Sequence, residues 1–173
     1  KLFLVFFGAF VLSLPVRAGD LVLERSYFED ASAALDFEAV RRQNFTPYAG
    51  PLGRGFGHST VWLRLRIAAS QPGDSADAVG AAAVPVVLRI RQPYLDEIRL
   101  YDPQGLGPQP LLTGDRYSSA DERYRSLNFN FVIPSSREDR DIWLAIRSSS
   151  TRLIHAEAFA FNEIVECQIG IEF

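Results

Sequence analysis

The chain has 173 residues, 47% of them hydrophobic, which is enough to build one domain with a substantial core. Its 21 acidic and 18 basic residues leave a net charge of −3, so the composition argues against a nucleic-acid partner. Because Cys167 is the single cysteine, an internal disulfide is excluded.

Residues 1–18 are predicted to be a signal peptide. Lys1 gives a short positive start, residues 2–14 are apolar but too short to span a bilayer, and residues 16–18 resemble a small-residue cleavage site. A buried strand or an uncleaved anchor is the alternative interpretation. Export without an internal disulfide favours a bacterial periplasm over a eukaryotic secretory route.

The chain from residue 19 onwards is predicted to be a β domain with one short N-terminal helix. Residues 21–28 are expected to form the first strand, and residues 32–42 carry apolar side chains at helical spacing. Residues 59–68 alternate most regularly, with four aliphatic side chains on one face of the predicted strand. The opposite face carries Trp62, Arg64 and Arg66.

Residues 84–105 are the centre of the predicted fold and are expected to form two strands joined at residues 92–94. Pro93 has no backbone donor, so it interrupts the ladder between the two strands. In each strand aliphatic residues alternate with polar ones, as in a sheet with one buried face. The polar faces carry Arg89, Arg91, Glu97, Arg99 and Tyr101.

The second half of the chain continues this pattern. Residues 70–84 are interpreted as a flexible surface insertion. Many short strands separated by turn residues are typical of a β-sandwich or jelly roll. The remaining strands are expected at residues 111–113, 127–133, 141–147 and 153–162.

Catalytic constellations are scarce in the sequence. His58 and His155 lack the spacing of metal ligands, and no GxSxG motif is present. Asp96 and Glu97 alternate faces on a strand and cannot act as a carboxylate pair. We therefore expect neither enzymatic activity nor a metal or cofactor in this chain.

A ligand-binding face is the positive indication that remains. Arginine forks bind carboxylates and phosphates, and Trp and Tyr rings stack on sugars or cations. If the strands neighbour one another, their outward side chains form one groove for an anionic or sugar-like small molecule. The alternative is that arginine stems and indole rings simply cover a sheet face. The outward set is Trp62, Arg64, Arg66, Arg89, Arg91, Arg99, Tyr101, Asn128, Asn130, Trp143 and Arg147.

Five segments also resemble, in the same order, segments of one known family. They are TVWLRLRI at residues 60–67, PYLDEIRLY at 93–101, TGDR at 113–116, NFNFVIP at 128–134 and WLAIRSSS at 143–150. Together they are similar to the second type of extracellular domain of the 7TMR-DISM proteins, which are bacterial seven-transmembrane receptors with diverse intracellular signalling modules. The resemblance extends from about residue 21 to residue 162.

The resemblance implies a jelly-roll-like β-sandwich, similar to carbohydrate-binding modules, over residues 19–162. It implies a sensor at the periplasmic face of the inner membrane that binds a carbohydrate or another small molecule. Residues 163–173 would be the juncture to a transmembrane bundle. That bundle would be the domain's partner and would pass the signal to a diguanylate cyclase, phosphodiesterase or histidine kinase output.

The matched motifs add loop residues to the candidate site. Asp96 and Asp115 occupy motif positions and are expected to hold loops by accepting hydrogen bonds from backbone amides. Tyr94 and Arg116 occupy motif positions as well and join the ligand-binding set. The predicted ligand-binding residues are Trp62, Arg64, Arg89, Arg91, Tyr94, Tyr101, Arg116, Asn128 and Trp143.

Two other functions fit the same pattern. A secreted carbohydrate-binding module attached to a hydrolase would continue into a linker and a catalytic domain. A ligand-free dimerisation domain would present an apolar patch in place of a groove. A homodimer is also compatible with the sensor hypothesis.

Overall fold

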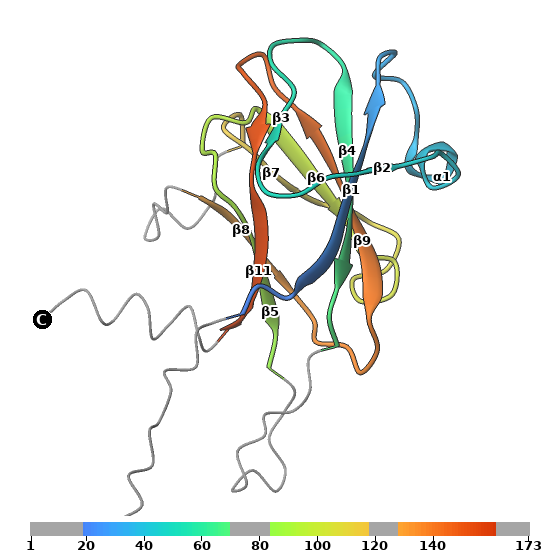
Figure 1. Ribbon diagram of the computed structural model, residues 1–173, viewed down its shortest axis with the longest axis vertical. Coiled ribbons are helices and arrows are strands. Elements are labelled where there is room, and N and C mark those ends of the chain that lie inside the picture. Colours follow the sequence, from blue (N-terminus) through green and yellow to red (C-terminus); the bar gives the residue numbers. More distant parts are fainter. Residues whose placement is uncertain (1–18, 70–83, 118–127, 162–173) are drawn as a thin grey trace, which may run out of the picture.

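Two antiparallel sheets pack face to face and share one hydrophobic core (Figure 1). The computed structural model describes residues 19–69, 84–117 and 128–161. The predicted all-β sandwich with one short helix is confirmed. The expected signal peptide, the juncture at residues 163–173 and most of the insertion at residues 70–84 lie outside the described residues.

The larger sheet carries most of the side chains that define the site. In spatial order its strands are β2 (Thr46–Pro47), β1 (Val22–Asp30), β4 (Thr60–Ile67), β9 (Arg140–Arg147), β6 (Glu97–Tyr101) and β7 (Leu111–Thr113). The smaller sheet consists of β11 (Ala156–Ala160), β5 (Val86–Ile90) and β8 (Phe129–Ile133). Two short strands, β3 (Leu52–Gly53) and β10 (Leu153–Ile154), pair separately, and the helix is α1 (Phe37–Val40).

Strand β4 lies between β1 and β9 and turns its aliphatic face into the core. Leu63 and Leu65 are fully buried and lie opposite Leu144 and Ile142 of β9. Burying one such side chain contributes about 1.5–3 kcal/mol. Because side chains alternate along a strand, the same register sets the intervening residues of β4 on the outer face of the sheet.

The segment between β5 and β6 carries the chain from the smaller sheet to the larger one. Both strands predicted within residues 84–105 are present, yet they belong to different sheets. Leu95, in the connection, is fully buried and fixes the crossing against the core. Alternation shows which face of a strand is buried but not which strand is its neighbour, and the sequence therefore left this crossing open.

The helix predicted over residues 32–42 is shorter in the structure, where α1 has four residues. The carboxylate of Asp30 accepts hydrogen bonds from the backbone N–H groups of Ser32 and Leu35, both at 3.0 Å. These hydrogen bonds bend the residues between Asp30 and the helix into a turn. Asp36 then caps the helix by accepting a hydrogen bond from the N–H of Ala39 at 2.8 Å.

The strand predicted over residues 153–162 is divided into β10 and β11. The division falls at His155, whose backbone N–H donates to the side-chain oxygen of Gln92 at 3.0 Å. Before this point the chain pairs with β3, and after it the chain pairs with β5. The interruption therefore marks a change of pairing partner, which the residue pattern does not encode.

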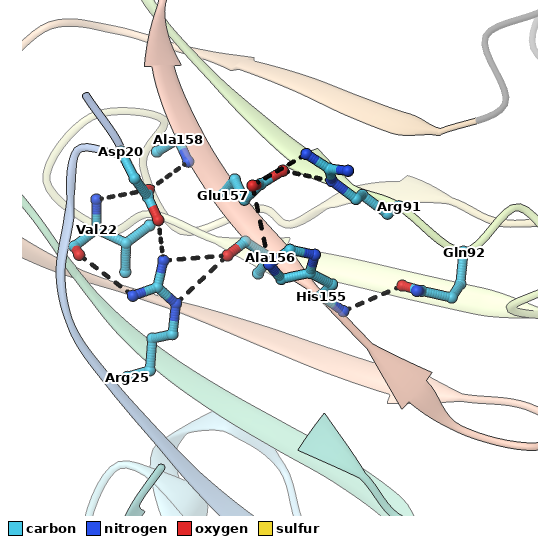
Figure 2. A network of polar contacts seen from close by, with 9 residues as sticks. All are labelled: Asp20, Val22, Arg25, Arg91, Gln92, His155, Ala156, Glu157 and Ala158. Carbon is cyan, nitrogen blue, oxygen red and sulfur yellow. Dashed lines mark hydrogen bonds and ion pairs between the residues drawn. The ribbon is translucent and has the colours of Figure 1, made fainter. Parts of the chain in front are cut away.

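A cluster of polar contacts joins the start of β1 to β11, and so ties one sheet to the other (Figure 2). The carboxylate of Asp20 accepts hydrogen bonds from the N–H groups of Val22 and Ala158 and pairs with the guanidinium of Arg25. Arg25 also donates to the carbonyl of Ala156 at 3.3 Å. The two sheets are thereby held together at this edge by hydrogen bonds as well as by the core.

A buried ion pair fixes the turn after β6 against the start of β9. The Asp102 carboxylate is fully buried, and Arg140 donates to its two oxygens at 2.9 and 3.1 Å. Arg140 also donates to the carbonyl of Pro134 at 2.6 Å. A side chain at Gly105 would lie 2.4 Å from the Asp102 carboxylate, so the turn requires glycine there.

We predict that Asp102→Ala lowers the free energy of unfolding by about 3–5 kcal/mol, because it leaves the charge of Arg140 buried without its partner. Urea unfolding measures the change. The control is Glu38→Ala, which removes an exposed ion pair with Arg41 and should cost less than about 0.5 kcal/mol. A loss below about 1 kcal/mol for Asp102→Ala would contradict the assigned role of this pair.

Candidate functional site

The outer face of the larger sheet brings aromatic rings and guanidinium groups into adjacent rows. Cross-strand register places Arg64 of β4 opposite Trp143 of β9, and Trp143 opposite Tyr101 of β6. The next row contains Trp62 opposite Ala145. The four predicted residues on this face therefore lie together, as the sequence pattern indicated.

A segment that precedes β2 covers the middle of this face, and we call it the α1 segment, residues 36–45 (Figure 1). Phe37 stacks on Tyr101, with ring centroids 4.4 Å apart and an angle of 12° between the ring planes. The same ring meets Trp143 edge-on at 5.4 Å. Trp62 is only 3% exposed beneath the segment, so this predicted ligand-binding side chain is inaccessible in the described conformation.

Beside the α1 segment, the face opens into a cleft of about 460 Å³, which we call the Arg64 cleft. The guanidinium of Arg64 lies over the ring of Phe45, 5.4 Å from its centroid. It has no carboxylate partner among the residues that the structure describes. The lining also includes Glu24, Tyr48, Arg66 and Asp141.

Arg66 adds a polar group to the lining of the Arg64 cleft, whereas the Tyr48 hydroxyl is buried. Arg66 pairs with Asp141 at 3.4 Å, a long contact between two half-exposed groups that is worth at most about 1 kcal/mol. The Tyr48 hydroxyl has no hydrogen-bond partner among the described residues. Burial raises the pKa of Tyr48 to about 12, against a lowering influence of Arg25, so the phenol stays protonated at neutral pH.

A second, smaller cleft of about 290 Å³ adjoins the first, and both share Arg66 and Asp141. In this cleft the guanidinium of Arg41 lies 5.7 Å from the ring centroid of Trp143. Together the two clefts flank the α1 segment with arginines and aromatic rings. Such a surface is suited to a small ligand that carries both an acid group and a flat apolar ring.

The hypothesis that all outward residues share one groove is wrong, because the strands that carry them belong to two sheets. Arg89 lies on β5, and Arg91 and Asn128 lie beside β5 and β8, at the outer face of the smaller sheet. Arg91 pairs there with Glu157 at 2.6 Å. Arg89 lies over Phe159, 5.4 Å from the ring centroid, in an arrangement that closely matches Arg64 over Phe45.

The motif residues in loops form a third group. Arg116 pairs with Asp96 at 3.0 Å, and Tyr94 is exposed in the connection between β5 and β6. The expected structural role of Asp96 is confirmed, because its carboxylate accepts a hydrogen bond from the N–H of Ser149 at 2.8 Å. The side chain of Asp115 is exposed and has no such bond among the described residues.

Sequence reasoning missed the side chains that the α1 segment and the following residues contribute. These side chains lie in the helix predicted over residues 32–42 or in the residues directly after it, and they are Phe37, Arg41, Phe45 and Tyr48. The apolar residues at helical spacing over residues 35–40 did indicate that this segment packs against another surface. It could not identify the sheet face that provides this surface.

Two searches of the described ranges gave negative results. Among residues 19–69, 84–117 and 128–161, no group of three or more His, Cys, Asp or Glu side chains is arranged to hold a metal ion. Within those same ranges no helix is both long enough and apolar enough to cross a membrane.

Comparison with known proteins gave one finding. A family model described as 7TMR-DISM extracellular 2 matches residues 24–158, which is most of the chain. The match spans nearly all of both sheets and includes every element of the site described above. A search of curated proteins returned no match.

The Asp96 carboxylate gives a testable dependence of stability on pH. The N–H of Ser149 chiefly, then its hydroxyl and Arg116, lower the pKa of Asp96 below its ordinary value of 3.8. A carboxyl whose pKa is lower in the folded than in the unfolded chain stabilises the fold at pH values above its unfolded-state pKa. This stability is lost as the pH falls through the folded-state pKa. We predict that Asp96→Asn loses less stability than the wild type between pH 5 and pH 3 in urea unfolding.

Asp115→Asn is the matched control, since Asp115 is an exposed carboxyl in a neighbouring loop. It should leave the acid dependence unchanged. Equal acid sensitivity of the wild type and Asp96→Asn would show that the charge of Asp96 does not hold its loop.

Proposed function

The chain belongs to the 7TMR-DISM extracellular 2 family, and from that premise we propose that it senses a small ligand on behalf of a bacterial membrane receptor. The family is one of extracellular domains, so the chain works outside the cytoplasm. The proposed location is the periplasmic face of the inner membrane, reached through the signal peptide expected at residues 1–18. The proposed role is binding, with catalysis left to an intracellular output module.

One observation carries the proposal, namely the unpaired guanidinium of Arg64 in an open cleft beside aromatic rings. Among the described residues, Arg25, Arg66 and Arg99 each have a carboxylate partner, whereas Arg64 has none. A half-buried arginine without a counter-charge is available to a ligand. The rings of Phe45 beneath it and of Tyr48 near it supply an apolar wall.

The proposed ligand is a carbohydrate or another small molecule, with an acid group as the feature that Arg64 would recognise. A guanidinium binds a carboxylate with two parallel hydrogen bonds. The neighbouring rings provide flat apolar surfaces of the kind that small-molecule sites use around a few polar groups. Two carboxylates also line the cleft: Asp141 is held by Arg66, which limits its repulsion of an incoming acid, and Glu24 is exposed, so solvent and salt screen its charge.

The proposed signalling partner is the receptor's own transmembrane bundle. Strand β11 is the last described strand, and residues 163–173 are expected to lead from it to the membrane. A ligand that binds one conformation of the domain better than another would shift the balance between the two. The size of that shift is limited by the difference in affinity for the two states.

We predict that a thermal-shift screen of the purified chain against neutral sugars, uronic acids, dicarboxylates and amino acids gives a hit, and that Arg64→Ala removes it. A ligand bound only to the folded state raises the melting temperature by mass action. Loss of one charged hydrogen-bonding group is worth about 1.5–3 kcal/mol, or roughly 10–100-fold in affinity.

Arg89→Ala is the matched control, because both arginines are half-buried on outer faces and lie 5.4 Å from one phenylalanine ring. A hit that survives Arg89→Ala but not Arg64→Ala supports the proposed face. The reverse pattern would move the site to the smaller sheet. A panel without any hit would speak against a small-ligand sensor and direct attention to self-association.

A further inference from the structure

The two tryptophans of the chain lie on one floor beneath the α1 segment. Trp62 and Trp143 are both on the outer face of the larger sheet, and Tyr101 lies 5.6 Å from Trp62 between ring centroids. Tyr101 is also directly opposite Trp143 in the register. We call these three residues the aromatic floor.

The aromatic floor carries two hydrogen-bond donors that no described residue satisfies. The indole N–H groups of Trp62 and Trp143 are both buried and have no partner. Buried donors are almost always paired in folded proteins, and leaving one unpaired costs about 1–3 kcal/mol. Two such groups on one sheet face indicate a surface built to meet acceptor atoms that the α1 segment does not supply.

The α1 segment is hydrogen-bonded to the larger sheet only through the residues that directly precede and follow it. Before it, Arg147 donates to the carbonyl of Ala33 at 2.6 Å, and after it Thr46 pairs with Tyr27 of β1. Every described hydrogen bond and ion pair of residues 36–45 stays within the segment. Between the two attachments, the segment is held by packing of its rings and of the buried Val40, and by the contacts of Arg41 with Trp143 and of Arg64 with Phe45.

The ring of Phe37 covers part of the aromatic floor. It lies nearly parallel to Tyr101 at stacking distance and makes a T-shaped contact with Trp143. A pyranose ring has a comparable flat apolar face, and it also carries oxygen atoms around its rim. Those oxygens could accept from the two indole N–H groups, whereas a phenylalanine ring offers them nothing.

We propose that the α1 segment is a lid over a sugar-ring site, and that a ligand ring displaces Phe37 from the aromatic floor. This inference rests on the proposed function and extends the Arg64 cleft under the lid. The acid group of the ligand remains at Arg64, and its ring lies on Tyr101 and Trp143. The closed lid and the bound ring are mutually exclusive occupants of the same surface.

The lid can be tested by tryptophan fluorescence, because both tryptophans of the chain lie under it. Phe37→Ala removes the occupying ring, and Asp36→Ala removes only the helix cap. Both variants should stay folded and increase quenching of tryptophan by acrylamide, by about twofold or more for Phe37→Ala. Ser136→Ala, which removes a similar side-chain to backbone hydrogen bond in a remote turn, should leave quenching unchanged.

Binding is tested with three hexasaccharides: a galacturonate oligomer, which carries acid groups, and neutral chitin and maltose oligomers for comparison. The galacturonate oligomer should bind Phe37→Ala at least tenfold more tightly than the wild type, because no closed lid competes. Adding Tyr101→Ala to Phe37→Ala should abolish that binding. Melting temperatures measured in parallel show that each variant is folded.

Equal affinity of the wild type and Phe37→Ala, or no binding of any probe to Phe37→Ala, would overturn the lid. So would tryptophan quenching that is unchanged in both lid variants. The thermal-shift screen with Arg64→Ala separates this failure from failure of the sensor proposal. If a ligand's affinity falls in Arg64→Ala but is unchanged in Phe37→Ala, the sensor proposal is supported and the lid proposal is not.

Discussion

The register of β4 between β1 and β9 is the constraint on which the rest of the structure depends. Its aliphatic face supplies fully buried side chains to the core, and a slip by one residue would expose all of them. The same register fixes the outer face, where Arg64 meets Trp143 and Trp62 meets Ala145. Stability of the core and geometry of the candidate site are therefore set by one alignment of strands.

The outer face resolves a conflict between two demands. Three aromatic side chains on a solvated sheet face would expose a large apolar surface, which favours aggregation or a partner. The α1 segment covers that surface with Phe37 and Val40 but leaves two indole N–H groups unpaired. A cover that is apolar enough to protect the floor, yet unable to satisfy its donors, remains open to competition from a ligand with oxygen atoms.

Sequence patterns were sufficient for the longer strands and their buried faces, since period-2 alternation reports burial directly, but not for the two-residue strands β2 and β3. They were insufficient for pairing, because Arg64 and Arg89 stand in the same kind of pattern but lie on different sheets. Only long-range contacts decide that difference. The α1 segment was hardest to predict, because the packing partner of its apolar residues cannot be inferred until the sheet face beneath them is known.

A sensor requires an element with two states, and the described structure limits where that element can lie. Most inward residues of both sheets are buried and the central strand ladders are continuous, so small rearrangements there are costly. The α1 segment lacks hydrogen bonds to the sheet between its two attachments. If its open form were populated at about 1%, the lid would weaken ligand affinity about 100-fold, and each tenfold change in the open population would shift the response threshold about tenfold.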